Sequence, residues 1–149
     1  MAAIKEWFGL YNIMYDWFEK KYGYQELEEY WSYIARSCYA DLAVKFREKG
    51  PEYIRDYYES IFLADGGKAK GVVHGNEVVV EVLESPDIKW MQAFDNPNFK
   101  TVPYYFNHYE VIFREIAKMA GIEFDMLENR EDGKCRWAFR NKGWEVSAL

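Results

Sequence analysis

Residues 70–83 read KGVVHGNEVVVEVL, and this stretch decides the fold class of the chain. The apolar residues upstream recur at helical spacing, whereas the valine-rich segments on either side of Gly75-Asn76 are typical of strands. Gly and Asn tolerate the backbone angles of a two-residue hairpin turn. We therefore predict a β-hairpin with strands over 70–74 and 77–83. The turn sets three cross-strand pairs: His74 with Glu77, Val72 with Val79, and Lys70 with Glu81.

Three amphipathic helices are predicted upstream of this hairpin, because apolar side chains recur there at spacings of three and four residues. They cover residues 4–21, 24–49 and 51–64. Gly23 stops the first helix, and Gly50-Pro51 ends the second and opens the third. The apolar face of the second helix includes Cys38, which we therefore place in the core.

A short helix and a long helix are predicted downstream of the hairpin. Ser85 is the N-cap and Pro86 the first residue of a short helix that reaches about Phe94. Residues 95–102 form a predicted loop. The long helix covers 103–120, with proline at its start and glycine after its end.

The chain ends in a second predicted hairpin. Apolar and charged residues alternate over 122–126 and 135–140, and Asp132-Gly133 marks a turn between them. Residues 141–149 are a predicted loose tail. Helices segregated from antiparallel hairpins define an α+β fold. We expect one domain over all 149 residues: N-terminal helices plus two hairpins that form a sheet of about four strands, with a long helix between the hairpins.

The composition stands out in its aromatic content, which is 19%, with 13 Tyr, 10 Phe and 6 Trp. Each aromatic side chain buries a large area, so a domain of this size needs few of them for stability. The excess has three interpretations. It can belong to an aromatic core, to a flat-sided pocket, or to an apolar surface that pairs with a second copy of the chain.

The charge and hydropathy of the chain limit its partners and its location. The net charge of −6 argues against a nucleic-acid partner, because phosphate binding needs a basic stripe. We expect neither a membrane span nor a signal peptide, since no stretch approaches about 18 consecutive apolar residues and no basic segment precedes an apolar block. Two cysteines make no disulfide framework. A cytoplasmic protein is the expectation.

Known catalytic signatures are absent, so an active site must be assembled from scattered residues. His108 can exchange protons near neutral pH, and Tyr104, one turn earlier, can orient a substrate. Asp87 is a candidate base or a group that binds a cation, and Cys135 is a candidate nucleophile. Each has a structural alternative: a backbone carbonyl partner for His108, helix-dipole stabilisation for Asp87, and a place in the core for Cys135.

Four aromatic residues are candidate contacts for a small hydrophobic ligand: Trp90, Tyr105, Tyr109 and Trp137. We expect no metal and no cofactor, because the chain has two histidines far apart and no cysteine pair with metal-ligand spacing. His74, beside a predicted turn, is expected to face solvent.

Four segments carry a family resemblance: Ser85-Pro86-Asp87, Val102-Pro103-Tyr104-Tyr105, His108-Tyr109, and Asp132-Gly133-Lys134-Cys135-Arg136-Trp137. With them, the last two-thirds of the chain resembles the bacterial L-2-amino-thiazoline-4-carboxylic acid hydrolase-like family. Relatives carry cysteine before the two prolines, where this chain has Ser85 and Val102. Cys135 remains as the cysteine at a matching place. The resemblance implies the α+β fold and a ring-opening hydrolase activity.

Three functional hypotheses follow from these observations. The first is an enzyme that acts on a small heterocyclic or aromatic organic acid, with His108 as acid or base. The second is a non-catalytic protein that binds a hydrophobic or aromatic small molecule. The third is an interaction protein that forms a homodimer through exposed aromatic residues.

Overall fold

The computed structural model describes residues 5–144, and its architecture confirms the predicted α+β fold. The described residues form one four-stranded antiparallel sheet in the order β1-β2-β4-β3. The strands are β1 (Lys68–His74), β2 (Glu77–Glu84), β3 (Glu123–Glu128) and β4 (Arg136–Arg140). The helices are α1 (Trp7–Tyr22), α2 (Tyr24–Cys38), α3 (Ala40–Lys49), α4 (Pro51–Ala64), α5 (Pro86–Gln92), the 3-10 helix η1 (Pro97–Phe99) and α6 (Asn107–Ala120).

The first hairpin has the register that its Gly75-Asn76 turn predicts. The pairs are His74 with Glu77, Val72 with Val79, and Lys70 with Glu81. The other edge of β2 pairs with β4, and β4 pairs in turn with β3. The two predicted hairpins therefore join into one sheet along β2 and β4.

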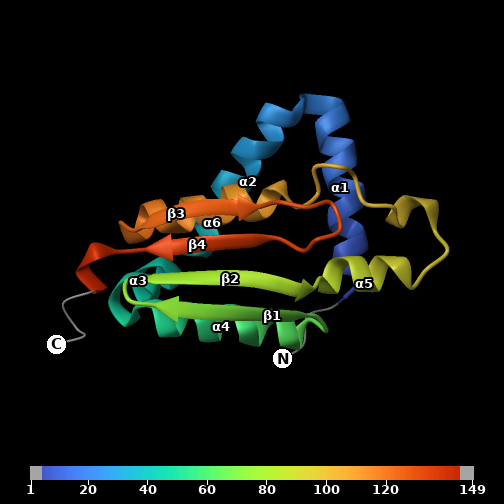
Figure 1. Ribbon diagram of the computed structural model, residues 1–149. Coiled ribbons are helices and arrows are strands. Elements are labelled where there is room, and N and C mark those ends of the chain that lie inside the picture. The colour runs from blue at the N-terminus through green and yellow to red at the C-terminus, as the bar shows by residue number, and fades with distance from the viewer. Residues whose placement is uncertain (1–4, 145–149) are drawn as a thin grey trace.

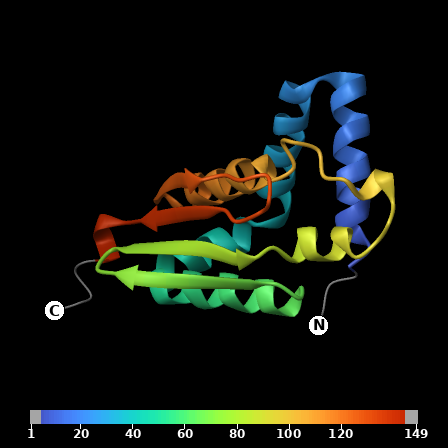
Figure 2. The ribbon, with the colours of Figure 1, turned by 45° about the vertical axis from the view of Figure 1, so that its right-hand side comes forward.

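The helices cover one face of this sheet (Figures 1 and 2). Toward the helices the central strands present fully buried side chains: Val78, Val80, Val82, Trp137 and Phe139. Helix α4 packs on β1 and β2, and α6 packs on β3. Helices α1 and α2 form a pair that rises beyond the sheet (Figure 2). The hydrophobic core thus lies between the sheet and the helical layer.

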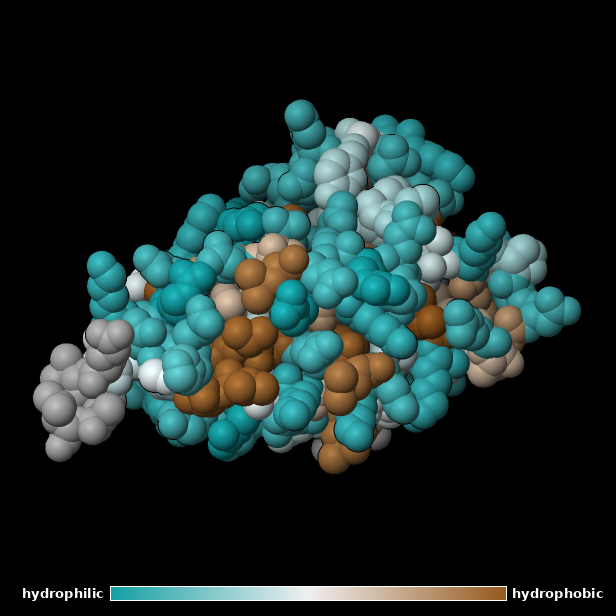
Figure 3. Space-filling model, viewed as in Figure 1, coloured by the Kyte–Doolittle hydropathy of each residue, from teal (hydrophilic) through white to brown (hydrophobic). Residues whose placement is uncertain are grey.

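The opposite face of the sheet is uncovered by other elements of residues 5–144. Figure 3 looks onto this face and shows apolar side chains among charged ones. Val72, which is 54% exposed, belongs to a row that continues across Val79 and Ala138. Arg140 forms ion pairs with Glu77 on the neighbouring strand β2 and with Glu123 on β3. No helix in the described part of the chain is long and apolar enough to cross a membrane.

The helix predicted over 24–49 is wrong in one respect, because it is two helices that meet at Tyr39. The backbone of Tyr39 has φ −118° and ψ 16°, outside the helical region, although its amide still donates to the Ala35 carbonyl oxygen at 3.0 Å. Neither glycine nor proline marks this break. Cys38 consequently lies exposed at the end of α2 and not in the predicted core.

The long helix begins at Asn107, four residues later than predicted. Residues 103–106 form turns instead, in which the Tyr105 amide donates to the Val102 carbonyl oxygen at 3.0 Å.

The predicted loose tail is ordered where the structure describes it. Trp144 is buried, and its indole N–H donates to the Arg47 carbonyl oxygen at 3.2 Å. A large aromatic side chain anchors this segment against the end of α3. The last five residues of the predicted tail, and residue 4 of the first predicted helix, lie outside the described residues.

Candidate functional site

A cavity of about 170 Å³ lies in the helical layer, between α1, α4, α5 and α6. Eight of the fifteen described residues that line it are phenylalanine or tyrosine. The tyrosines are Tyr11, Tyr39, Tyr57, Tyr58 and Tyr109, and the other polar side chains are Asp65, Asp87 and His108. We call this the tyrosine cavity. Mainly apolar walls with a few polar groups are typical of sites that bind small molecules.

Asp87 enters the cavity wall from the first turn of α5. The local sequence fixes this turn as predicted: Ser85 Oγ accepts a hydrogen bond from the Ile88 amide at 3.3 Å, and Pro86 is the first helical residue. The carboxyl group of Asp87 is buried, and the residue is 4% exposed. The Tyr105 hydroxyl donates to Asp87 Oδ2 at 2.7 Å. The Tyr105 phenol thus holds the buried carboxyl in place, and the Tyr109 phenol also interacts with it.

Burial raises the pKa of Asp87 from 3.8 to about 6, because a carboxylate loses hydration when it leaves water. The hydrogen bond from Tyr105 lowers this pKa and offsets part of the effect. The negative charge of Asp65, at the end of α4, raises it further. Asp87 therefore gains and loses its proton close to neutral pH.

Two glycines let neighbouring turns approach the start of α5. A Cβ at Gly67 would lie 2.5 Å from Pro86 Cδ, so the turn after α4, which carries Asp65, can pack directly against α5. A Cβ at Gly133, in the β3–β4 connection, would lie 2.5 Å from Ser85 Cβ. Any larger residue at either position would push these turns away from Asp87.

His108 lines the cavity from the first turn of α6. Its Nδ1 lies 2.6 Å from the Tyr105 carbonyl oxygen. A carbonyl oxygen only accepts, so Nδ1 carries the proton and Nε2 is left as an acceptor. Burial lowers the pKa of His108 to about 4, so the ring is neutral at pH 7. The carbonyl partner expected for a structural His108 is confirmed, and the ring reaches the cavity as well.

Tyr58 also lines the cavity, and its hydroxyl group has no hydrogen-bond partner among the described residues. Its side chain is fully buried, and no atom of residues 5–144 pairs with the hydroxyl. Buried hydroxyl groups in proteins nearly always have a partner, because an unpaired one costs free energy. The hydroxyl oxygen itself has almost no accessible surface, so it lies behind the cavity surface.

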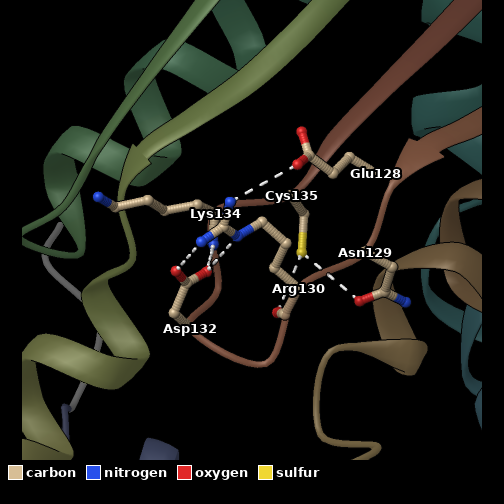
Figure 4. Close-up of polar contacts among 6 residues, drawn as sticks. All are labelled: Glu128, Asn129, Arg130, Asp132, Lys134 and Cys135. Carbon is tan, nitrogen blue, oxygen red and sulfur yellow. Dashed lines mark hydrogen bonds and ion pairs between the residues drawn. The ribbon is translucent and has the colours of Figure 1, made fainter.

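Cys135 lies outside the described lining of the tyrosine cavity. Its Sγ is 3.6 Å from Asn129 Oδ1 and 3.8 Å from the Arg130 carbonyl oxygen, in the connection before β4 (Figure 4). Burial raises the pKa of Cys135 to about 11, so the thiol keeps its proton at neutral pH and is a weak nucleophile. The structure does not bring Cys135 and His108 to one cavity, and it favours the core role for this cysteine.

Tyr104 also lies outside the cavity lining. Its hydroxyl donates to the Tyr15 carbonyl oxygen at 3.2 Å, and its ring packs edge-on against Tyr24 at 5.5 Å. Two of the four predicted catalytic residues, Asp87 and His108, therefore share the cavity, and two do not.

Of the predicted ligand contacts, Tyr109 lines the cavity. Tyr105 lies behind the wall, where it links Asp87 and His108 through its hydroxyl and its carbonyl. Trp137 is fully buried in the core against Tyr58, with ring centroids 5.1 Å apart. Trp90 packs elsewhere, in a cluster with two phenylalanines near η1. Helical spacing alone does not distinguish a cavity wall from a packed core.

The sequence analysis did not identify five lining residues that carry polar atoms: Tyr11, Tyr39, Tyr57, Tyr58 and Asp65. Tyr11, Tyr57 and Tyr58 belong to the apolar faces of two predicted helices, which is the pattern of core positions. Asp65 precedes Gly66-Gly67 at the end of the third predicted helix, where the sequence indicates only a helix end. One sequence feature could have indicated the cavity: the apolar faces of three helices carry tyrosines in place of aliphatic residues, and their hydroxyl groups need hydrogen-bond partners.

The described residues contain no group of three His, Cys, Asp or Glu side chains that could hold a metal ion. In comparisons with known proteins, no family model, no curated protein and no solved structure matches the chain. The hydrolase-family resemblance stays a prediction, and function has to be argued from the cavity itself.

Proposed function

We propose that the protein binds one small organic molecule in the tyrosine cavity, with the carboxyl group of Asp87 as its polar anchor. The observation that carries this proposal is a buried carboxyl in the wall of a mainly aromatic cavity. An aspartate in a first helical turn stabilises the helix dipole without being buried. Burial costs free energy instead, so helix stability does not explain the place of Asp87.

The size of the cavity agrees with a ligand of about one ring. An apolar cavity of about 150 Å³ holds one benzene molecule, and the tyrosine cavity measures about 170 Å³. Tyr11, Tyr39 and Tyr57 are partly exposed, so the cavity is reached from their side. A single aromatic ring with a short polar substituent fits these dimensions.

An enzyme that uses Asp87 as acid or base is the second candidate, favoured by the pKa of about 6. His108, with its pKa near 4, supports such chemistry as a neutral acceptor and not as a proton donor. The predicted organic-acid substrate is less well supported. No Lys or Arg occurs among the described residues of the lining, so an acid would bind there without a counter-ion.

Self-association through an apolar surface remains the third prediction. It rests on α1, where Trp7, Leu10 and Trp17 are 50%, 58% and 53% exposed. Exposed large apolar side chains on one helix are typical of contact surfaces. Sedimentation of the purified chain tests this prediction.

Blocking the cavity tests the binding proposal. Ile61 lines the cavity from α4, so Ile61→Trp is expected to fill it and abolish the binding of single-ring compounds. Leu63, on the same helix, is 73% exposed, which makes Leu63→Trp the matched control. We expect calorimetry with benzylamine, benzyl alcohol and benzoate to show one saturable site in the wild type and in the control. The proposal fails if none of the three binds, or if they bind equally well to Ile61→Trp.

A further inference from the structure

The tyrosine cavity, we infer, selects a small organic cation: an amine whose ammonium group lies against Asp87 and among the tyrosine rings. This inference rests on the proposed binding function and adds the charge class of the ligand. It follows from three properties of the lining, which are the sign of its charges, its hydrogen-bonding groups and its aromatic faces.

The charged side chains in the described lining are both acidic. They are Asp65 and Asp87, which enter from the neighbouring ends of α4 and α5. Lys5 lies near this region, with its Nζ beside Gly66, but it does not belong to the lining. The protein as a whole has a net charge of −6. The buried charge of Asp87 in a concave site without a cationic side chain in its described lining attracts ligands of the opposite sign, which here are cations.

The polar atoms in the wall are suited to a ligand that donates hydrogen bonds. An ionised Asp87 only accepts, and the neutral His108 offers Nε2 as an acceptor because its Nδ1 proton is bound to Tyr105. A primary ammonium group carries three donors, whereas a carboxylate ligand carries only acceptors. Asp87 and His108 therefore complement an amine, whereas an acid would find donors only among the tyrosine hydroxyls of the wall.

The aromatic rings add a second attraction for a cation. Tyr58 meets Tyr57 and Phe113 edge to face, with both pairs of ring centroids 5.1 Å apart, so the rings border the cavity at steep angles to one another. A cation near a ring face is attracted by the negative charge of the π system, and most strongly where water is excluded. An aromatic cavity with a buried carboxylate attracts a cation through both interactions, whereas a neutral ligand gains at most a hydrogen bond to the carboxylate.

Three probes with the same ring separate the charge classes: benzylamine, benzyl alcohol and benzoate. We expect calorimetry at pH 7.5 to show benzylamine binding at least about tenfold more tightly than benzyl alcohol, and benzoate binding weakest. In Asp87→Asn, benzylamine is expected to lose more affinity than benzyl alcohol, so that its advantage over the neutral probe disappears. Asp95 is exposed on a loop, so Asp95→Asn is the control and is expected to bind all three probes like the wild type.

The outcomes distinguish this inference from the binding proposal. Equal affinities for benzylamine and benzyl alcohol, or tighter binding of benzoate, would overturn the selection of cations and leave the binding site in place. No binding of any probe would overturn both. The comparison of probes on the wild type decides the question even if Asp87→Asn does not fold.

Discussion

We expect Asp87→Asn to make the protein more stable at neutral pH and more sensitive to acid. The pKa of Asp87 is raised from 3.8 to about 6 in the folded state, so the carboxyl group holds its proton longer when folded. Below pH 3.8 the carboxyl group is protonated in both the folded and the unfolded state, and above about pH 6 it is ionised in both. The pH window between these two values is where stability changes. Within the window the unfolded chain loses its proton first, so stability falls as the pH rises and stays reduced at neutral pH.

The magnitude follows from the width of that window. It spans about two pH units at about 1.4 kcal/mol per unit, so ionised Asp87 costs the folded protein about 3 kcal/mol at neutral pH. Asparagine has nearly the same shape, and its side-chain oxygen can accept from the Tyr105 hydroxyl. A neutral acceptor binds this hydroxyl less strongly than a carboxylate, so we expect a net gain of about 1–2 kcal/mol for the variant at pH 7.

His108 titrates in the opposite direction. Its pKa is lowered from 6.5 to about 4 in the folded state, so the unfolded chain takes up a proton first as the pH falls. The free energy of unfolding therefore falls as the pH drops from 6.5 to about 4. The loss is at most about 3 kcal/mol, because the side chain of His108 is partly exposed. In the wild type, Asp87 and His108 therefore change the free energy of unfolding in opposite directions over nearly the same pH range.

Urea unfolding of the wild type and Asp87→Asn between pH 4 and 7.5 measures this effect. The informative quantity is the difference between the two proteins, because other titrating groups cancel in it. This difference is expected to grow in favour of the variant by about 2.4 kcal/mol from pH 4 to pH 7. His108→Asn is expected to show a trend of the opposite sign. A difference for Asp87→Asn that stays constant within about 0.5 kcal/mol would refute the burial argument.

Three further predictions concern single positions. Tyr58→Phe removes a hydroxyl without a partner in the described part of the chain, so we expect the free energy of unfolding to stay within about 0.5 kcal/mol or to rise; a fall of about 2 kcal/mol would reveal a partner. Cys38 is exposed and Cys135 is buried with a raised pKa, so a thiol reagent is expected to modify the native chain rapidly at one site, and Cys38→Ser should abolish that reaction. Gly67→Ala is expected to destabilise the protein by about 1–3 kcal/mol because its Cβ would overlap Pro86. Gly143→Ala is the control, since its Cβ would meet no atom within 3.4 Å, and equal stabilities of the two variants would contradict the argument.

Local features of the fold could be predicted because a few adjacent residues determine them. Gly75-Asn76 specifies a tight turn, and that turn alone sets the register of the first hairpin. Ser85 and Pro86 likewise define the start of α5 locally, because Ser85 caps the amide of Ile88 and Pro86 is the first helical residue. The break at Tyr39 has no such signal, because it carries neither glycine nor proline. The helical spacing of the side chains continues through it.

The site could be predicted only in part, because its properties depend on residues distant in the sequence. The sequence predicts that Asp87 either stabilises the dipole of its helix or acts as a base or cation-binding group. Nothing near it in the sequence indicates that it is buried. Its burial comes from Tyr105 and from the turn after α4, which the close approach at Gly67 allows. His108 was identified for its ordinary pKa near neutrality, yet the aromatic rings around it lower that pKa to about 4.

The late start of α6 connects the two ionisable groups of the cavity. In a regular helix from residue 103, the Tyr105 carbonyl would accept the amide of Tyr109 four residues on. The Tyr109 amide instead donates to the Phe106 carbonyl oxygen at 3.1 Å, and the Tyr105 carbonyl accepts from His108 Nδ1. The hydroxyl of the same Tyr105 donates to Asp87. One residue in a non-helical turn thereby fixes the tautomer of His108 and the position of Asp87, so the departure from the predicted helix is what assembles the polar part of the cavity.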